Sequence, residues 1–163
     1  MSNTPVRMAN FSLSVVVPAY NESTNLIKFV EVLRQTIQSI TARYEIIIIN
    51  DGSKDNTDEV CTQLALEKGI RYLSFSRNFG KEAALSAGID YARGDAVLLI
   101  DADFQHPMDK LAEMCLLWQS GYDMVYGIIV DRGNESFLKR FGTRLFYSLM
   151  STGTDVPIPQ NAG

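Results

Sequence analysis

The sequence predicts an α/β fold in which a mostly parallel open sheet carries helices on both faces. Short apolar, β-branched runs alternate with segments whose apolar residues follow helical spacing. Such alternation favours right-handed crossovers between parallel strands. A chain of 163 residues is long enough for one hydrophobic core. We therefore expect one domain over residues 13–163, preceded by a mobile polar lead-in over residues 1–12.

Composition narrows the class of protein. Hydrophobic residues make up 46% and charged residues 21%, the balance of an ordinary soluble globular domain. The net charge of −4 argues against nucleic-acid binding, which needs a dominant basic face. No apolar stretch is long enough to span a bilayer. Cys61 and Cys115 lack ligand-like spacing, so we expect buried free thiols and a reducing compartment.

Apolar runs bounded by turn residues predict the strands of the sheet. They lie at residues 13–17, 44–49, 70–75 and 95–100, with a fifth short strand at 123–127. Helical spacing predicts the helices that connect and follow them. They lie at residues 21–40, 57–68, 81–93, 107–120 and 135–150. Asn21 or Ser23 is expected to cap the first helix, and Gly69, Gly94 and Gly121 to end later ones.

Three of the predicted strands end in a polar cluster. The clusters are Tyr20-Asn21-Glu22, Asp51-Gly52-Ser53 and Asp101-Ala102-Asp103. Because the carboxyl ends of parallel strands meet at one edge of a sheet, these clusters should form a single crevice. Like charges gathered there repel unless a metal ion or a ligand with many donors binds among them.

The last of these clusters is the candidate metal site. The apolar residues 97–100 predict a strand buried on both faces, and Asp101 and Asp103 follow it directly. Alternate side chains of a strand share a face, so the two carboxylates should point the same way. With Gln105 as a neutral oxygen ligand, they suit a hard divalent cation that also holds substrate phosphates. The alternative is an acidic turn before a helix that begins at Pro107.

Glycine-rich phosphate loops are absent from the sequence. After the first strand the chain reads Pro-Ala-Tyr-Asn-Glu-Ser, residues 18–23, where a dinucleotide site needs several glycines. A P-loop pattern is also missing. These absences argue against a dehydrogenase and indicate that phosphates are held through a metal.

Four motifs in order and spacing resemble family 2 glycosyltransferases of the GT-A fold. They are Val-Val-Val-Pro-Ala-Tyr-Asn-Glu (15–22), Asn-Asp-Gly-Ser-Lys-Asp-Asn-Thr (50–57), Ser-Arg-Asn-Phe-Gly-Lys-Glu-Ala-Ala (76–84) and Asp-Ala-Asp-Phe-Gln-His-Pro (101–107). Within this family the chain is most similar to polyprenyl-phosphate glycosyltransferases of the dolichol-phosphate mannose synthase-like branch. The resemblance runs from residue 13 to the end of the chain.

The resemblance implies a Rossmann-like nucleotide-sugar-binding fold and an inverting transfer from a UDP- or GDP-sugar to a polyprenyl phosphate. Mg²⁺ or Mn²⁺ bound by Asp103 and Gln105 would assist departure of the nucleoside diphosphate. Tyr20 would pack on the base, and Asp51 would accept from a ring N–H. The nucleotide-sugar-binding residues implied are Pro18, Ala19, Tyr20, Glu22, Ile49, Asp51, Arg77, Lys81, Asp101, Ala102 and Asp103.

The chain departs from the family pattern in two places. Ile129 stands where family members often carry the Arg of a Gly-x-Arg motif. The family also continues beyond the segment matching residues 161–163, with a candidate catalytic Asp, interface helices and usually transmembrane helices. We therefore expect the donor-binding front portion of an enzyme, without its catalytic base, and weak or no activity from this chain by itself.

Residues 135–150 predict a basic, aromatic-rich amphipathic helix. Such a helix suits a membrane surface, and packing on the sheet is the alternative. Together with the resemblance, it indicates the cytoplasmic face of a membrane and a role in the cell envelope. Expected partners are the nucleotide-sugar, the polyprenyl phosphate and the membrane surface, and a homo-oligomer is left open.

Two other functions remain open on the sequence. One is a family 2 transferase that acts on a polysaccharide acceptor, and the other is a nucleotide-sugar-binding module without catalysis. The sugar and the base are also open, although the Arg-Asn-Phe-Gly-Lys run at 77–81 resembles relatives that tend to use uridine.

Overall fold

A computed structural model describes residues 11–103 and 108–127. The chain divides into two compact units, residues 1–113 and 114–163, and the fold below is that of the first. The single domain expected over 13–163 stays a prediction. The helix expected at 135–150 lies outside the described residues, as do Gln105, Pro107 and Ile129.

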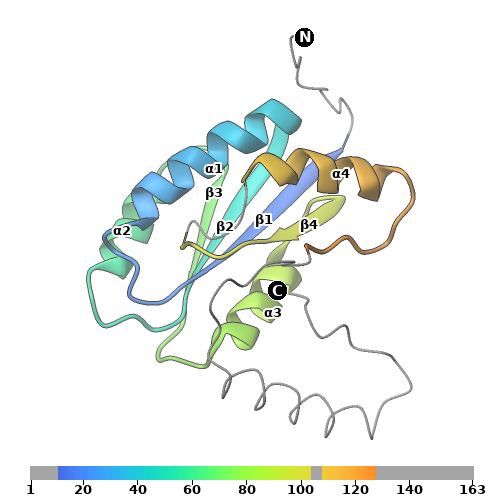
Figure 1. Ribbon diagram of the computed structural model, residues 1–163. Helices are drawn as coiled ribbons and strands as arrows, with labels where there is room; N and C mark the ends of the chain where they lie inside the picture. Colours follow the sequence, from blue (N-terminus) through green and yellow to red (C-terminus); the bar gives the residue numbers. More distant parts are fainter. Residues whose placement is uncertain (1–10, 104–107, 128–163) are drawn as a thin grey trace, which may run out of the picture. The chain divides into compact units, whose positions relative to one another are not determined.

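Four parallel strands form the sheet, in the order β3-β2-β1-β4 (Figure 1). They are β1 (Ser12–Ala19), β2 (Arg43–Asn50), β3 (Ile70–Ser74) and β4 (Ala96–Leu99). The predicted parallel α/β fold is confirmed. The strand order reverses beside β1, since β2 and β3 lie on one side of it and β4 on the other. Ligands of open α/β sheets bind at such a switch point.

Helices cover both faces of this sheet, as predicted. In Figure 1, α1 (Leu26–Ile40) and α2 (Thr57–Leu64) lie over one face, and α3 (Lys81–Tyr91) lies over the other. The chain continues into a short 3-10 turn, η1 (Met108–Lys110), and α4 (Leu111–Gln119). Within the described residues, no helix has the length and apolar character needed to cross a membrane.

The core has one layer on each side of the sheet. Helix α1 buries an apolar stripe that comprises Leu26, Phe29, Val30, Leu33, Ile37 and Ile40. On the other side, Val16 and Ile47 pack with Ala84 of α3. Helix α3 approaches closely because it carries Gly88 there: a Cβ atom at this position would lie only 2.2 Å from Cγ1 of Val16.

Several predicted helix ends are wrong. Helix α1 begins at Leu26, and neither Asn21 nor Ser23 caps it. Instead, Asn21 adopts a φ of 56° in the preceding loop, and Ser23 donates its backbone N–H to Asp55. These polar groups bind the neighbouring loop, and this tertiary use overrides their local preference for a cap.

The ends of the next two helices also differ. Helix α2 stops at Leu64 rather than near Lys68, and Gly69 closes the turn that follows with a φ of 87°. Helix α3 ends at Tyr91, before the predicted residue 93. Gly94 fills a different role, because a Cβ atom there would lie 2.6 Å from the backbone nitrogen of Ser14. By contrast, Gly121 follows α4 with a φ of 101°, as expected for a helix terminator.

Two strand predictions are wrong as well. Val97 and Leu99 in β4 are 40% and 44% exposed, so this strand is not buried on both faces. Within the described residues, β4 pairs only with β1, so it is an outer strand. Residues 123–127 form no strand. An apolar run of four or five residues has the same sequence pattern in a central strand, an outer strand or an irregular segment.

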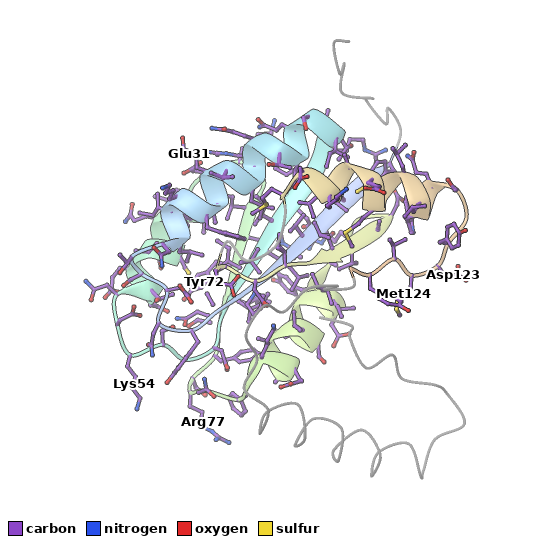
Figure 2. All side chains as sticks on the ribbon, viewed as in Figure 1. Glu31, Lys54, Tyr72, Arg77, Asp123 and Met124 are labelled. Atoms are coloured by element: carbon purple, nitrogen blue, oxygen red, sulfur yellow. The ribbon has the colours of Figure 1, made fainter. Side chains whose placement is uncertain are left out.

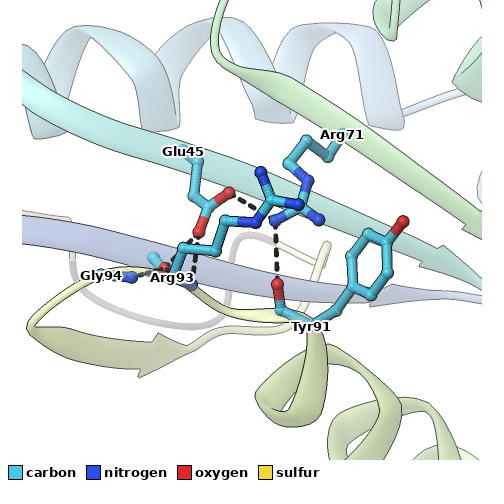
Figure 3. Close-up of polar contacts among 6 residues, drawn as sticks. Glu45, Arg71, Tyr91, Arg93 and Gly94 are labelled. Carbon is cyan, nitrogen blue, oxygen red and sulfur yellow. Dashed lines mark hydrogen bonds and ion pairs between the residues drawn. The ribbon is translucent and has the colours of Figure 1, made fainter.

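At the amino ends of the strands, a polar network joins neighbouring segments (Figure 3). Glu45 of β2 accepts hydrogen bonds from Ser14 Oγ at 2.6 Å, Arg71 Nη1 at 2.7 Å and the Arg93 backbone N–H at 2.8 Å. The Arg71 guanidinium also lies 4.0 Å from the centre of the Tyr91 ring. Burial raises the pKa of Glu45, but these hydrogen bonds outweigh burial, and the pKa is lowered overall.

Cys61 and Cys115 are both free and buried, as predicted. Burial raises the pKa of the Cys61 thiol to about 12. The thiol is therefore protonated near neutral pH, so it is a packing residue and not a nucleophile.

Candidate functional site

An open cleft of about 470 Å³ lies at the carboxyl edge of the sheet. This volume is within the range of small-molecule sites. The cleft is lined by Pro18, Ala19, Tyr20, Glu22, Asp51, Asn78, Gly80, Lys81, Asp101, Ala102 and Asp103. The three polar strand ends predicted to meet therefore do meet, together with the start of α3.

One wall of the cleft consists of the loops after β1 and β2, which are hydrogen-bonded to each other. Asn21 donates its backbone N–H to Ser53 Oγ at 2.9 Å, and its side-chain oxygen accepts from the Lys54 N–H at 2.8 Å. Glu22 donates its N–H to Thr57 Oγ1 at 2.9 Å. The turn residues of the sequence thus fix one loop against the other. Tyr20, which is 42% exposed, lies on this wall.

The Asp55 carboxylate strengthens the same wall. It accepts hydrogen bonds from the Ser23 backbone N–H and from both the N–H and the hydroxyl of Thr57. Hydrogen bonding with Ser23, followed by that with Thr57, lowers the pKa of Asp55 from 3.8 to about 2. The loop contacts therefore include a carboxylate that remains charged well into the acid range.

The segment that leads into α3 also lines the cleft. Asp51, at the end of β2, accepts the backbone N–H groups of Phe79 at 2.7 Å and Gly80 at 3.0 Å. Gly80 precedes the helix with a φ of 98°, a conformation that favours glycine. The next residue, Lys81, places its ammonium 2.6 Å from Asp101 Oδ2.

The two carboxylates after β4 lie in a turn. The strand itself ends at Leu99, although Ile100 still donates its N–H to the Val16 carbonyl at 3.1 Å. Asp101 and Asp103 both line the cleft, and Ala102 between them is buried. The two side chains reach one cleft, as expected, but a turn brings them there and strand alternation does not.

The residues present fit a divalent cation that arrives with a phosphate ligand. In the part of the chain that the structure describes, no three His, Cys, Asp or Glu side chains cluster to hold a metal. Mg²⁺ is commonly bound by one or two carboxylates with substrate phosphates and water completing the shell. Asp101 and Asp103 offer that kind of donor set on the cleft wall.

Two predicted binding residues do not line the cleft. Ile49 is fully buried and packs with Val16 and Ala84 in the core beside α3. Arg77 is exposed and points outward in Figure 2, with its guanidinium 4.3 Å from the centre of the Phe79 ring. Asn78 and Gly80 line the cleft although they were not named as site residues. Both residues belong to the 76–84 motif, from which the sequence analysis predicts only Arg77 and Lys81 as binding residues.

Taken together, these features define a class of protein. The parallel sheet and the acidic cleft at its switch point place the chain among open α/β folds that bind ligands at the carboxyl ends of their strands. The chain belongs to glycosyl transferase family 2, whose family profile matches residues 14–161.

Curated relatives agree with this assignment. The chain is 43% identical over 152 residues to an uncharacterized glycosyltransferase, sll0501, of Synechocystis, covering 93% of the chain and 48% of the relative. It is 40% identical to a prophage bactoprenol glucosyl transferase homolog of Escherichia coli, covering 93% of the chain and 50% of the relative. The chain thus spans about half the length of the curated relatives that it matches.

Solved structures share the fold. The mannosyltransferase PcManGT from Pyrobaculum calidifontis, solved with GDP-Man and Mn²⁺, matches with a TM-score of 0.61 at 20% identity, over 86% of this chain and 39% of that one. S. aureus TarS 1-349 in complex with UDP matches with a TM-score of 0.56 at 17% identity. The match covers 77% of this chain and 38% of that one. At these identities the likeness establishes the fold alone.

Proposed function

We propose that the cleft binds a UDP- or GDP-sugar together with Mg²⁺ or Mn²⁺, and that the sugar is transferred to a polyprenyl phosphate. The observation that carries the proposal is the meeting of Asp101, Asp103, Lys81 and Tyr20 in one cleft at the switch point of a family 2 fold. An acidic pair suits a cation and an ammonium suits phosphate oxygens, while an exposed aromatic ring suits a base.

The nucleoside would lie against the wall formed by the loops after β1 and β2. Pro18, Tyr20 and Glu22 line that wall, and the hydrogen bonds to Ser53 and Thr57 hold the loop in place. The ring of Tyr20 is exposed enough for one face to pack on a base. A wall fixed before the ligand arrives reduces the entropy that binding costs.

The diphosphate would lie at the other end, near Lys81, Asp101 and Asp103. Carboxylates repel a diphosphate, so its approach to Asp103 requires a cation between them. When bound, the cation would neutralise negative charge that develops on the departing nucleoside diphosphate. Asp103 would hold that cation, with Gln105 as the second ligand proposed from the sequence.

The acceptor is proposed from the relatives. Proteins named bactoprenol glucosyl transferase are 40% identical to this chain over 93% of its length. A phosphate oxygen of the lipid would attack the anomeric carbon as the bond to the nucleoside diphosphate breaks, which inverts that carbon. A phosphate monoester is largely anionic near neutral pH, so alignment matters more than a strong base. The cytoplasmic face of a membrane is the proposed location.

A transfer assay tests this function. The protein would be incubated with a UDP- or GDP-sugar labelled in the sugar, Mn²⁺ and a polyprenyl phosphate in detergent, and label in the lipid phase would be counted. Metal-dependent labelling of the lipid supports the proposal. Binding of the nucleotide-sugar without labelled lipid would indicate a donor-binding module. Absence of both binding and transfer would contradict the proposal.

A further inference from the structure

Asn50, the last residue of β2, carries a buried amide behind the cleft. The residue is only 2% exposed and does not line the cleft. Its side-chain oxygen accepts the backbone N–H of Ser53 at 3.0 Å, and its Nδ2 donates to Asp58 at 3.1 Å and to the Tyr72 hydroxyl at 3.2 Å. An amide offers an acceptor and two donors, and these partners use both kinds of group. Asn50 thus joins the loop after β2 to α2 and β3.

Asp58, in the first turn of α2, anchors the Asn50 amide. One oxygen of its carboxylate accepts from Asn50, from the Tyr72 hydroxyl and from Ser74 Oγ, the last at 2.9 Å. Hydrogen bonding with Tyr72, followed by that with Ser74, lowers the pKa of Asp58. The carboxylate is therefore ionised near neutral pH, and hydrogen bonds to an ionised acceptor are among the stronger ones in proteins. This anchor keeps the oxygen of the amide turned toward the Ser53 N–H.

Ser53 connects the Asn50 amide to the loop after β1. Its hydroxyl oxygen accepts the backbone N–H of Asn21 at 2.9 Å, and Asn21 directly follows Tyr20. Asn21 has a φ of 56°, a conformation that residues other than glycine adopt rarely and that surrounding contacts must hold. A series of hydrogen bonds therefore runs from Asp58 through Asn50 and Ser53 to the residue beside Tyr20.

We propose that Asn50 and Asp58 are positioning residues for the nucleoside end of the cleft. They hold the loop at Ser53, and through it Tyr20, in the conformation that receives the base. The proposal rests on the proposed function, since it names the part of the donor that this network serves. Neither residue lines the cleft, so any effect on binding must pass through the wall formed by the loops after β1 and β2.

A reciprocal exchange of the two side chains tests the proposal. Asn50→Asp places a second carboxylate where an amide now lies 3.1 Å from Asp58, and the two like charges repel. Binding of a nucleoside diphosphate should weaken about tenfold, the size expected for one charge-assisted contact. Asp58→Asn should stay within about twofold of the wild type, because its amide oxygen still accepts. The double variant restores a donor and an acceptor in reverse order, and its affinity should return to within about threefold of the wild type.

Comparison of two ligands separates positioning of the nucleoside from general distortion. Calorimetry in Mg²⁺ would use UDP or GDP, whichever the wild type binds, and inorganic diphosphate, which has no nucleoside. Inorganic diphosphate should bind the wild type and all three variants within about twofold. Glu45→Ala is the control for lost stability, since it breaks a polar network at the other edge of the sheet.

Four results would overturn the proposal. They are full affinity in Asn50→Asp, a double variant that binds as weakly as Asn50→Asp, an equal loss of inorganic diphosphate, and an equal loss of the nucleoside diphosphate in Glu45→Ala.

Tyr72→Phe provides a second route that adds no charge. It removes the hydroxyl that donates to Asp58 and accepts from Asn50, and it should weaken the nucleoside diphosphate roughly threefold. Tyr44→Phe is the matched control, because its hydroxyl accepts from Gln38 Nε2 at 2.9 Å near the other end of β2. If the two substitutions have equal effects on affinity, the proposal is wrong.

A measurement without ligand separates this proposal from the proposed function. Amide hydrogen exchange at Ser53 and Asn21 should be faster in Asn50→Asp than in the wild type and should return toward the wild-type rate in the double variant. If the wild type binds no nucleotide, the proposed function fails, and the exchange rates decide whether Asn50 and Asp58 position the wall. Unchanged rates in Asn50→Asp overturn that role, and faster rates that the double variant reverses support it.

Discussion

The two edges of the sheet each carry a pair of opposite charges, but the pairs are built differently. At the amino edge, the Glu45 and Arg71 side chains are 16% and 21% exposed, and Glu45 accepts from two further groups (Figure 3). At the carboxyl edge, the Lys81 and Asp101 side chains are 55% and 28% exposed and line an open cleft.

This difference indicates which edge stabilises the fold and which is available to a ligand. At the amino edge the charges satisfy one another and join three strands, so removing one takes a hydrogen-bond partner from each of the others. At the carboxyl edge the lysine is well solvated, and an ion pair of this kind contributes little to stability. Charges that stabilise little and face a cleft are suited to binding. The following predictions test that division.

The largest effect is expected at Asp103. Asp103→Ala should lower the metal-dependent affinity for the nucleotide-sugar by at least the roughly 10- to 100-fold seen when even an outer-shell metal partner is lost. The thermal midpoint should stay unchanged, because Asp103 is exposed. Calorimetric titration in Mn²⁺ measures the affinity. Asp109→Ala is the matched control, since Asp109 is an exposed carboxylate that does not line the cleft. Equal effects of the two substitutions would refute the assignment.

Glu45→Ala should have the opposite effect to Asp103→Ala: it should lower stability and leave ligand affinity almost unchanged. It removes the acceptor of Ser14, Arg71 and the Arg93 N–H, and we expect the free energy of unfolding to fall by about 1–3 kcal/mol. Affinity for the nucleotide-sugar should remain within about twofold. Urea unfolding measures the first quantity and calorimetry the second. If Glu45→Ala keeps its stability but loses affinity for the nucleotide-sugar, the proposed division between a stabilising edge and a binding edge is wrong.

Lys81→Met sharpens the comparison at the carboxyl edge. Since the ion pair with Asp101 is largely solvated, unfolding free energy should change by less than about 1 kcal/mol. Binding of the nucleoside diphosphate should weaken about tenfold through loss of one charge-assisted contact. Lys110→Met is a suitable control, because Lys110 is also exposed and paired, with Glu113. A loss of stability as large as that of Glu45→Ala would show that Lys81 stabilises the fold and would contradict this prediction.

The smallest effect concerns pH. The pKa of Asp55 is about 2 in the folded protein against 3.8 for the free side chain. The contribution of Asp55 to stability is therefore complete above pH 3.8 and is lost as the pH falls toward 2. Urea midpoints between these values should fall less steeply in Asp55→Asn than in the wild type. Identical pH profiles would show that Asp55 does not hold the loop wall.

Hydrophobic pattern and strand-end chemistry were sufficient to predict the parallel sheet and most of the cleft. Both depend on local signals: β-branched runs for the strands and clustered Asp, Asn and Gly residues where they end. The outer position that β4 has among the described strands was not predictable, because residues 97–100 are as apolar as a central strand and exposure depends on which neighbours pair with it. The burial of Ile49 was not predictable for a related reason, because it depends on the close packing of α3 against β2, which brings Ala84 onto this residue.

The contacts of Asp51 show another feature that the sequence does not predict. The sequence marks Asp51 and Gly52 as a turn at a strand end, and that is correct. It does not show that residues 77–80, which are remote in sequence, press against this turn. Only the folded backbone shows that Asp51 and the residue before Lys81 share a hydrogen bond.

One measurement tests the central claim most directly: calorimetric titration of the protein with UDP- and GDP-sugars, each with Mn²⁺ and with the metal removed by a chelator. We predict saturable binding of one of the two nucleotide-sugars in Mn²⁺ and a loss of at least about tenfold in affinity without it, because Asp101 and Asp103 repel an unneutralised diphosphate. Absence of binding to both donors, or equal affinity with and without metal, would contradict the assignment of the carboxyl edge as a metal-dependent donor site.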